Sequence, residues 1–348
     1  MLGGIAMKMK RLGRTNLMVT ENSFGALPIQ RLSSGEAAAL LRRAYDAGIN
    51  FFDTARAYTD SEEKIGLGLS DVRGSIVIST KSAGKTRQAV LSDLSVSLEK
   101  LKTGYVDVMQ LHNIPALPDP ADPESPYAAL VQARREGKCR FIGITTHRID
   151  VALAAAECGL YDTVQFPLSY LSSEQDLKLI EVCRQRDVGL IAMKALAGGL
   201  VSSGTAAFAF FAQFDNAVPI WGIQRQSELQ EFLDAAAGQV CLTPALRAVI
   251  EQDKQVLTGD FCRGCGYCKP CPASIDIPWV GRMSLLLRRA PWQEYATPEG
   301  QEKMRQVEQC ISCGACKSRC PYGIDGSKLT RDNWEDYQSF MREKGILQ

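Results

Sequence analysis

Residues 75–81 read Ser-Ile-Val-Ile-Ser-Thr-Lys, and residues 106–112 read Val-Asp-Val-Met-Gln-Leu-His. Each is a short run rich in apolar and β-branched residues, as expected of a strand. Residues 87–101 lie between them and are predicted to form an amphipathic helix, because leucines recur there at helical spacing. These leucines are Leu91, Leu94, Leu98 and Leu101. A strand, a helix and a second strand in this order predict a parallel βαβ unit.

The same alternation continues from about residue 18 to residue 240. The expected strands are 22–27, 50–53, 75–81, 106–112, 141–145, 163–166, 189–194 and 218–223, and the expected helices include 34–47, 87–101, 127–136, 151–158, 174–186 and 228–237. Eight strands separated by helices predict a closed (β/α)8 barrel of the TIM type. An open doubly wound sheet is the alternative. Its usual Gly-rich turn is absent after the first strand, where residues 24–27 read Phe-Gly-Ala-Leu.

The alternation stops after Ala237. A helix is expected over residues 244–257, and the segment behind it is rich in Gly, Pro and Cys, which marks a change of domain. We therefore expect a barrel domain over residues 1–243, a connecting helix over 244–258 and a second domain with a C-terminal tail over 259–348. A length of 348 residues suits one large and one small domain.

The overall charge is close to zero, because 40 Lys and Arg residues balance 39 Asp and Glu residues, a formal net charge of +1. This balance gives no electrostatic reason to expect nucleic acid or an acidic membrane as a partner. No apolar run is long enough to span a bilayer. The opening residues 1–9 have no apolar core with a cleavage site behind it. The expectation is a cytoplasmic protein.

Polar residues occur where expected strands end. Asp53, Lys81 and His112 each end one, and Tyr58 follows Asp53 by five residues. In a parallel barrel the carboxyl ends of the strands meet at one rim, where barrel enzymes keep their chemistry. Each residue alone is more often a structural or solvated group, but His112 is one of only two histidines in the chain. Together the four form a candidate site.

The four side chains suit carbonyl reduction. The carbonyl oxygen must receive a proton as hydride arrives. A phenol is normally too weak an acid for this near neutral pH, but a nearby ammonium stabilises the phenolate and lowers the pKa of the phenol. Lys81 can supply this charge to Tyr58, Asp53 can hold Lys81, and His112 can orient the carbonyl. Such a set needs no metal.

Three motifs of this region carry a resemblance to a known family. Residues 50–58 read Asn-Phe-Phe-Asp-Thr-Ala-Arg-Ala-Tyr, residues 79–81 read Ser-Thr-Lys, and residues 107–112 read Asp-Val-Met-Gln-Leu-His. Over about residues 8–240 the chain resembles an aldo-keto reductase. The resemblance implies that the catalytic tetrad consists of Asp53, Tyr58, Lys81 and His112. It also implies hydride transfer between NADP(H), with NAD(H) as the alternative, and an aldehyde, a ketone or the corresponding alcohol.

The resemblance also assigns a nucleotide site. The implied contacts with the nicotinamide carboxamide are Thr145, Thr146 and Gln165, where the family commonly has Ser-Asn at the first two positions. Met193 replaces the tyrosine that usually stacks on the nicotinamide, Lys194 follows it, and Phe232 replaces an asparagine often found against the adenine. The implied contacts with the pyrophosphate and the adenosine 2′-phosphate are Leu196, Gly198, Gly222, Gln224 and Arg225. An arginine suits the 2′-phosphate because it binds phosphate oxygens in pairs.

Eight of the twelve cysteines lie between residues 262 and 320, which argues for one local purpose and against a disulfide framework. Residues 262–272 read Cys-Arg-Gly-Cys-Gly-Tyr-Cys-Lys-Pro-Cys-Pro, and residues 310–321 read Cys-Ile-Ser-Cys-Gly-Ala-Cys-Lys-Ser-Arg-Cys-Pro. The second motif has the spacing of bacterial ferredoxins. The segment therefore resembles a ferredoxin, and we expect a small ferredoxin-like domain of α+β or irregular structure.

In two-cluster ferredoxins the cysteine before the proline binds the other cluster. Carried over, the resemblance implies two [4Fe–4S] clusters. The first is held by Cys262, Cys265, Cys268 and Cys320, and the second by Cys310, Cys313, Cys316 and Cys271. The first motif departs from this pattern because two residues, and not three, separate its third cysteine from its last. Two zinc knuckles are the alternative, but regular triplets that end in Cys-Pro favour iron–sulfur.

Two functions follow from these features. The first is an NAD(P)H-dependent oxidoreductase that acts on a small carbonyl or alcohol, with clusters that transfer electrons or support the structure, and with a redox protein as a further partner. The second is an electron-transfer or docking protein with a non-catalytic barrel. Nicotinamide supplies two electrons as hydride whereas clusters usually pass one, and no flavin motif is visible to convert between them. The complete tetrad favours the enzyme.

Overall fold

The computed structural model describes residues 7–201, 203–257, 261–289 and 292–347. The chain divides into two compact units: residues 1–196 with 203–250, and residues 197–202 with 251–348. The short segment 197–202 thus groups with the C-terminal residues, although we expected it inside the barrel domain. The predicted domain boundary at residues 258–259 lies outside the described residues, and the predicted boundaries remain predictions.

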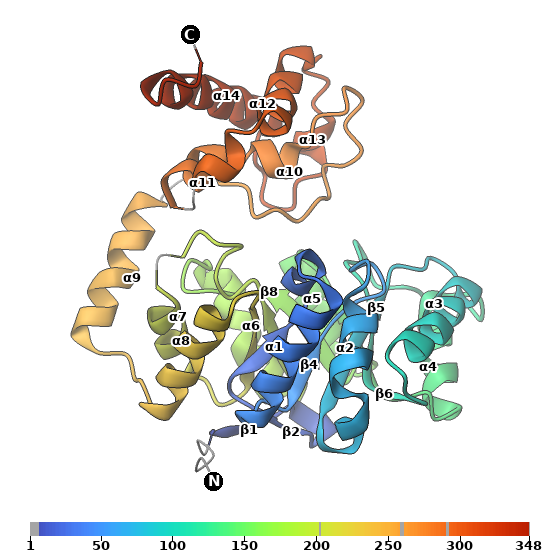
Figure 1. The fold of residues 1–348 in the computed structure, drawn as a ribbon. Coiled ribbons are helices and arrows are strands. Elements are labelled where there is room, and N and C mark those ends of the chain that lie inside the picture. Colours follow the sequence, from blue (N-terminus) through green and yellow to red (C-terminus); the bar gives the residue numbers. More distant parts are fainter. Residues whose placement is uncertain (1–6, 202, 258–260, 290–291, 348) are drawn as a thin grey trace. The chain divides into compact units, whose positions relative to one another are not determined.

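The first unit contains a closed barrel of eight parallel strands (Figure 1). In chain order they are β3 (Ser23–Gly25), β4 (Phe51–Asp53), β5 (Val77–Ser82), β6 (Val106–Leu111), β7 (Cys139–Thr145), β8 (Thr163–Pro167), β9 (Gly189–Met193) and β10 (Ala217–Gly222). Neighbouring strands follow this order, and β10 pairs with β3 to close the barrel. The predicted (β/α)8 barrel is confirmed, and every expected strand is present.

Helices follow the strands and cover the outside of the barrel (Figure 1). They are α1 (Ser34–Asp46), α2 (Ser61–Leu69), α3 (Arg87–Lys100), α4 (Pro126–Arg135), α5 (Ile149–Glu157), α6 (Glu174–Gln185), α7 (Gly204–Phe211) and α8 (Gln226–Ala237), with 3-10 turns at Gly13–Thr15, Pro28–Arg31 and Ser70–Ser75. The first helix illustrates why they form. Ser33 caps it and exchanges hydrogen bonds with Glu36, and its buried face repeats every three or four residues.

A hairpin that the sequence analysis did not anticipate precedes the barrel, formed by β1 (Met9–Arg11) and β2 (Met18–Thr20). Its turn contributes Leu12 and Leu17 to a buried apolar cluster with Phe51 and other inward-facing strand residues. The turn approaches β9 very closely: a Cβ at Gly13, whose φ is +52°, would lie 2.2 Å from the backbone N of Gly189. Only glycine fits there.

The described residues of the second unit form helices and irregular loops, without a strand. The helices are α9 (Pro244–Val256), which begins in the first unit, α10 (Ile277–Val280), α11 (Met283–Arg289), α12 (Pro298–Arg305), α13 (Ala315–Ser318) and α14 (Gly326–Glu343), with 3-10 turns at Trp292–Tyr295 and Gln306–Gln309. An apolar core that includes Val280, Met283, Met304 and Tyr337 holds them together. Of the two expected descriptions, α+β or irregular, the irregular one applies to this part. Across the described ranges, no helix has the length and apolar character needed to cross a membrane.

Candidate functional site

The barrel brings three of the predicted tetrad residues together. Strands β4, β5 and β6 are neighbours in the sheet. Asp53 ends β4, Lys81 lies one residue before the end of β5, and His112 follows β6 directly. Because all three strands are parallel, these side chains belong to the same carboxyl-terminal rim.

A buried ion pair lies at the centre of this group. The Nζ atom of Lys81 lies 2.6 Å from Oδ2 of Asp53 and also donates to the carbonyl oxygen of Thr54 at 2.6 Å. The side chains of Lys81 and Asp53 are only 1% and 2% exposed. Burial raises the pKa of Asp53, and the Lys81 ammonium opposes that rise. Each charge is therefore retained inside the barrel chiefly by the other.

Tyr58 lies on the loop between β4 and α2, and this loop continues alongside β5. The backbone N–H of Thr54 donates to Ser79 at 2.8 Å, and that of Arg56 donates to Lys81 at 2.9 Å. The loop therefore extends the pairing between β4 and β5 beyond the last strand residue. This extension keeps Tyr58 above the ion pair and not free in solvent.

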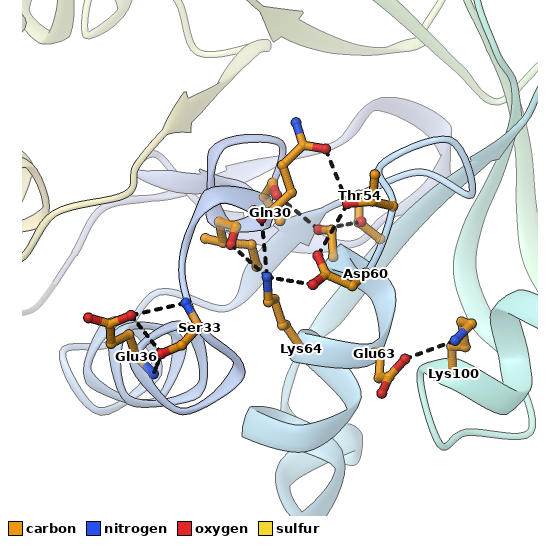
Figure 2. Close-up of polar contacts among 12 residues, drawn as sticks. Gln30, Ser33, Glu36, Thr54, Asp60, Glu63, Lys64 and Lys100 are labelled. Carbon is orange, nitrogen blue, oxygen red and sulfur yellow. Dashed lines mark hydrogen bonds and ion pairs between the residues drawn. The ribbon is translucent and has the colours of Figure 1, made fainter. Parts of the chain in front are cut away.

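Side chains fasten both ends of the Tyr58 loop (Figure 2). The hydroxyl oxygens of Thr54 and Ser61 lie 2.9 Å apart. Lys64 is almost fully buried, and its Nζ atom lies 2.8 Å from a carboxylate oxygen of Asp60 and 3.1 Å from the carbonyl oxygen of Ile29. Since α2 carries both Ser61 and Lys64, this helix fixes the loop from below.

The fourth tetrad member lies beside the other three. The ring centroid of Tyr58 is 5.2 Å from Nζ of Lys81 and 5.7 Å from the ring centroid of His112, with the two rings nearly perpendicular. Burial raises the pKa of the Tyr58 phenol more than the Lys81 charge lowers it. The sequence analysis expected Lys81 to lower the pKa of Tyr58. Its charge does act in that direction, but burial outweighs it, so the expected net lowering is wrong. Tyr58 is therefore protonated at neutral pH.

His112 is neutral at neutral pH. Burial, together with the positive charges of Lys81 and Lys85, lowers the pKa of His112 to about 3. A neutral imidazole can donate one hydrogen bond and accept another. This form suits a group that orients a polar oxygen without competing with Tyr58 for the proton.

The two threonines predicted to bind the nicotinamide are buried and engaged within the chain. Thr145 Oγ1 accepts from the backbone N–H of Asn113 at 2.7 Å. Thr146 Oγ1 donates to the carbonyl oxygen of Ile114 at 2.9 Å and accepts from the N–H of Arg148 at 3.1 Å. Both hydroxyls therefore brace the loop that follows His112.

Gln165, the third predicted carboxamide contact, points into the barrel and is 1% exposed. Its amide oxygen accepts from Gln110 at 2.8 Å, and its amide nitrogen lies 3.4 Å from Asp53. Two buried acceptors, Asp53 Oδ1 and Gln110 Oε1, have no hydrogen-bond partner among the described residues. Orphaned acceptors of this kind fit a polar ligand that donates hydrogen bonds.

The remaining predicted nucleotide contacts follow β9 and β10. Met193 ends β9 half-buried, and Lys194 and Gly198 both have left-handed backbone conformations, with φ of +54° and +68°. Leu196 is half-buried, and Gly198 belongs to the segment that groups with the second unit. Of these residues, Gly198 is exposed and the other three are half-buried.

The end of β10 presents Gly222, Gln224 and Arg225. Gly222 is exposed, and Arg225 lies 3.4 Å from Glu228 on α8. The side chain of Gln224 accepts from Arg31 at 3.2 Å. The sequence analysis missed Arg31, which is a second exposed cation at the predicted phosphate site. Its signal in the sequence is weak, because it lies almost two hundred residues before Gln224.

Phe232 is part of the core. It is 2% exposed, and its ring stacks on Trp221 with centroids 4.3 Å apart. Where the family often has an asparagine against the adenine, this chain therefore has a residue that packs inward.

The cysteines of the second unit group as the ferredoxin resemblance implied. Burial, followed by the thiols of Cys262, Cys265 and, less strongly, Cys320, raises the pKa of Cys268 to about 12, so these four lie close together. A separate cavity is lined by Cys271 of the first motif and by Cys310, Cys313 and Cys316 of the second, with Cys268 also on its wall. The last cysteine of each motif thus lies with the other motif's triplet.

Two glycines allow close approach to these groups. A Cβ at Gly281 would lie 3.3 Å from Cβ of Cys262, and a Cβ at Gly326 would lie 3.1 Å from Sγ of Cys316. The first three cysteines of each motif therefore have a glycine, without a side chain, on one side. This leaves room for a bulky inorganic group. In the described part of the chain no three His, Cys, Asp or Glu side chains are arranged to hold a single metal ion. A cubane makes no such demand, because each thiolate binds a different iron atom.

The two cysteine motifs also lead into similar segments. Residues 271–276 read Cys-Pro-Ala-Ser-Ile-Asp, and residues 320–325 read Cys-Pro-Tyr-Gly-Ile-Asp. Each aspartate precedes a helix, and each pairs with the lysine that follows the third cysteine of its motif. These pairs are Lys269–Asp276 at 2.9 Å and Lys317–Asp325 at 3.4 Å. The sequence analysis found no internal repeat and missed this short one, which relates the segments that follow the two cysteine motifs.

Comparison with known proteins identifies the class of each part. The description "Aldo/keto reductase family" matches residues 21–210, more than half of the chain, and "4Fe-4S dicluster domain" matches residues 261–325. The chain therefore belongs to the aldo/keto reductase family, whose members are oxidoreductases, and it carries a 4Fe–4S dicluster domain at its C-terminus.

Individual relatives agree with this assignment. L-galactose dehydrogenase of Arabidopsis thaliana is 31% identical over 215 residues, which cover 56% of this chain and 67% of the relative. A probable voltage-gated potassium channel subunit beta of Oryza sativa subsp. japonica is 37% identical over 122 residues, 30% of this chain and 37% of the relative. The chain thus spans two thirds or less of the length of these curated relatives.

Solved structures share the barrel. The holo form of an aldo-keto reductase from Bacillus halodurans has a TM-score of 0.60 at 21% identity, covering 71% of this chain and 96% of that chain. An aldo-keto reductase of Bombyx mori in complex with NADP has a TM-score of 0.56 at 18% identity, covering 73% and 95%. At these identities the likeness concerns the fold alone.

The buried histidines predict an acid-labile barrel. His147 is 6% exposed, and burial lowers its pKa well below the usual value. Between the folded pKa and the unfolded pKa near 6.5, only the unfolded chain binds the proton, so stability falls as pH decreases. Replacing His147 with Asn should therefore reduce the slope of unfolding free energy against pH below 6.5 by about 1.4 kcal/mol per pH unit. Urea titrations between pH 5 and 7 measure this slope, with exposed Cys158→Ser as the control. An unchanged slope would show that His147 is not kept neutral.

Proposed function

We propose that this protein is an NAD(P)H-dependent oxidoreductase that interconverts a small aldehyde or ketone and the corresponding alcohol. The observation that supports this most is the buried Lys81–Asp53 pair directly beside Tyr58 and His112. A buried ammonium next to a protonated phenol is costly as a structural device and useful as an acid catalyst.

In the proposed reduction, bound nicotinamide supplies hydride to the carbonyl carbon. Tyr58 holds the proton at its phenol oxygen and releases it to the carbonyl oxygen. The phenolate left behind lies in the field of the Lys81 ammonium, which Asp53 and the carbonyl of Thr54 hold in place. Neutral His112 donates a hydrogen bond to the carbonyl oxygen and orients it. The reverse reaction uses the same groups in the opposite order.

NADP(H) is the nucleotide we favour, with NAD(H) as the alternative. Aldo/keto reductases use NADP(H), and two exposed arginines, Arg31 and Arg225, lie near Gln224 and Glu228 at the end of β10. They provide the charge that a 2′-phosphate needs. Thr145, Thr146, Gln165, Met193, Lys194, Leu196, Gly198 and Gly222 remain the proposed contacts for the rest of the nucleotide. A rearrangement of Gln165 would be needed, since both ends of its amide are engaged.

For the second unit we propose two [4Fe–4S] clusters with the ligand sets Cys262, Cys265, Cys268, Cys320 and Cys271, Cys310, Cys313, Cys316. Two clusters accept one electron each, which together equals the two electrons of one hydride. A redox protein in the cytoplasm is the proposed exchange partner. The proximity of Cys268 to Cys262, Cys265 and Cys320 supports the first set, and the shared cavity supports the second.

A docking protein with a non-catalytic barrel is the second candidate. It is favoured by the inward packing of Phe232 and by the internal hydrogen bonds of Thr146 and Gln165, which leave fewer groups for a nucleotide. A relative named as a potassium channel subunit shows that the family's barrel also occurs under a non-enzymatic name.

Replacing Tyr58 with Phe separates the two candidates. The change removes one hydroxyl and should lower carbonyl turnover by about a hundredfold or more, because proton transfer in the transition state contributes on that scale. NADPH consumption is measured with a panel of aldehydes and ketones, using Tyr45→Phe on α1 as the matched control. Full activity of Tyr58→Phe with a substrate that the wild type turns over would refute the assignment.

Replacing Arg225 with Ala should weaken NADPH binding about tenfold and leave NADH binding nearly unchanged, because only NADPH carries the 2′-phosphate. Fluorescence titration with both nucleotides measures the effect. Arg42→Ala, at an exposed arginine of α1 paired with Asp71, is the control. Equal losses for both nucleotides would place Arg225 away from the phosphate.

Anaerobically purified protein should contain about eight iron and eight sulfide per chain, as two [4Fe–4S] clusters require. Metal and sulfide analysis tests this directly. Stoichiometric zinc without iron would contradict the cluster assignment, and four iron per chain would mean that only one cluster assembles.

A further inference from the structure

Arg282 lies next to one of the two cysteine groups. It follows Gly281, the residue that caps α10, and the backbone of Gly281 packs against Cys262, as the 3.3 Å distance from its added Cβ indicates. The same added Cβ would lie 2.9 Å from the carbonyl oxygen of Ile277. Arg282 is therefore tied by its own backbone to the position of a proposed cluster ligand.

The guanidinium of Arg282 has a defined place within the second unit. Its Nη2 atom donates to the carbonyl oxygen of Gly198, in the segment 197–202 of that unit. A Cβ at Gly198 would lie 2.9 Å from Nη2 and 3.3 Å from Cζ, so the guanidinium lies directly against the glycine backbone. Two independent constraints favour glycine at position 198: its φ of +68° and its close contact with the guanidinium.

One nitrogen of this guanidinium lacks an acceptor. Nε of Arg282 is buried and has no hydrogen-bond partner among the described residues. A buried charged donor without an acceptor is costly, and native proteins rarely leave one unsatisfied. Burial lowers the pKa of Arg282, and Cys262, followed by Tyr295, opposes this change. Cys262 has the larger effect of the two, so we take the cysteine group as the source of negative charge for Arg282.

We propose that Nε of Arg282 donates a hydrogen bond to a sulfur of the [4Fe–4S] cluster held by Cys262, Cys265, Cys268 and Cys320, and that it thereby raises the reduction potential of this cluster. The proposal rests on the cluster assignment above. Reduction adds one negative charge to the cluster. A buried cation that donates to its sulfur stabilises the reduced form more than the oxidised form.

The second cysteine group has no equivalent in the described residues. The basic residues beside it include Lys317, which is paired with Asp325, and Arg319, which donates to the carbonyl oxygen of Pro270. Arg331 donates to the hydroxyls of Ser312 and Ser327 at the surface. Exposed and compensated charges act weakly because water screens them. The two clusters should therefore differ in potential, and the cluster next to Arg282 should be reduced first.

The test is a redox titration of the cluster-loaded protein, followed by electron paramagnetic resonance. Arg282→Gln should shift one cluster toward its oxidised form by at least tenfold at a fixed potential, which is about 59 mV for one electron. The other cluster should not move. Arg305→Gln removes the same charge at an exposed site paired with Glu302 and should shift neither. Cys262→Ser, which alters the spectrum of its own cluster, identifies the one that moves.

Arg282→Lys separates hydrogen bonding from charge. Lysine keeps the charge but lacks the Nε donor, so it should give part of the shift. If Arg282→Gln does not retain its iron, the reduction potentials of Arg282→Lys alone test the proposal. An unchanged potential in the loaded variants, an equal shift of both clusters, or a shift confined to the cluster of Cys310 would overturn the proposal. The readout is independent of carbonyl turnover, so a barrel without activity would leave this result standing.

Discussion

An ammonium and a carboxylate share the interior of this barrel, and the candidate site depends on that pairing. Lys81 and Asp53 are almost completely removed from water and lie 2.6 Å apart. Removing one partner of such a pair leaves an unpaired buried charge, which costs about 3–5 kcal/mol. The carbonyl of Thr54 gives the ammonium a second acceptor, and this same residue begins the loop that carries Tyr58. The ion pair and the loop that carries Tyr58 are therefore held together through Thr54.

The second unit applies the same physical rule to a different chemistry. In the proposed cluster assignment its buried charges are thiolates, and iron and the Arg282 guanidinium compensate them. In both units a buried polar or charged group, whose burial without a partner costs free energy, lies where a bound cofactor or substrate can interact with it. The chain carries an aldo/keto reductase barrel and a dicluster domain, and the proposed function joins hydride transfer to single-electron transfer in one chain.

The sequence predicted the barrel well because parallel strands and amphipathic helices leave strong local patterns, and strand ends such as Asp53, Lys81 and His112 could be read directly. Each cysteine group could be predicted because three of its four members are close in sequence and the ferredoxin pattern implies the fourth, from the other motif. The hairpin around Gly13 was missed, since its strands have three residues each and leave no periodic signal. The roles of Thr146 and Gln165 and the proximity of Arg31 to Gln224 depend on side-chain contacts between distant segments, which no local pattern encodes. Tyr58 shows a third limit: its neighbours were foreseen, but not that burial would outweigh Lys81.

The most direct test of this account is a double-mutant cycle on the ion pair, using the free energy of unfolding of the barrel. Asp53→Asn and Lys81→Met should each be strongly destabilising, because each strands the other charge. The double variant should be at least about 2 kcal/mol more stable than the sum of the two losses predicts, since it leaves no unpaired charge. Strictly additive losses would contradict the central claim that the two charges hold each other inside the barrel.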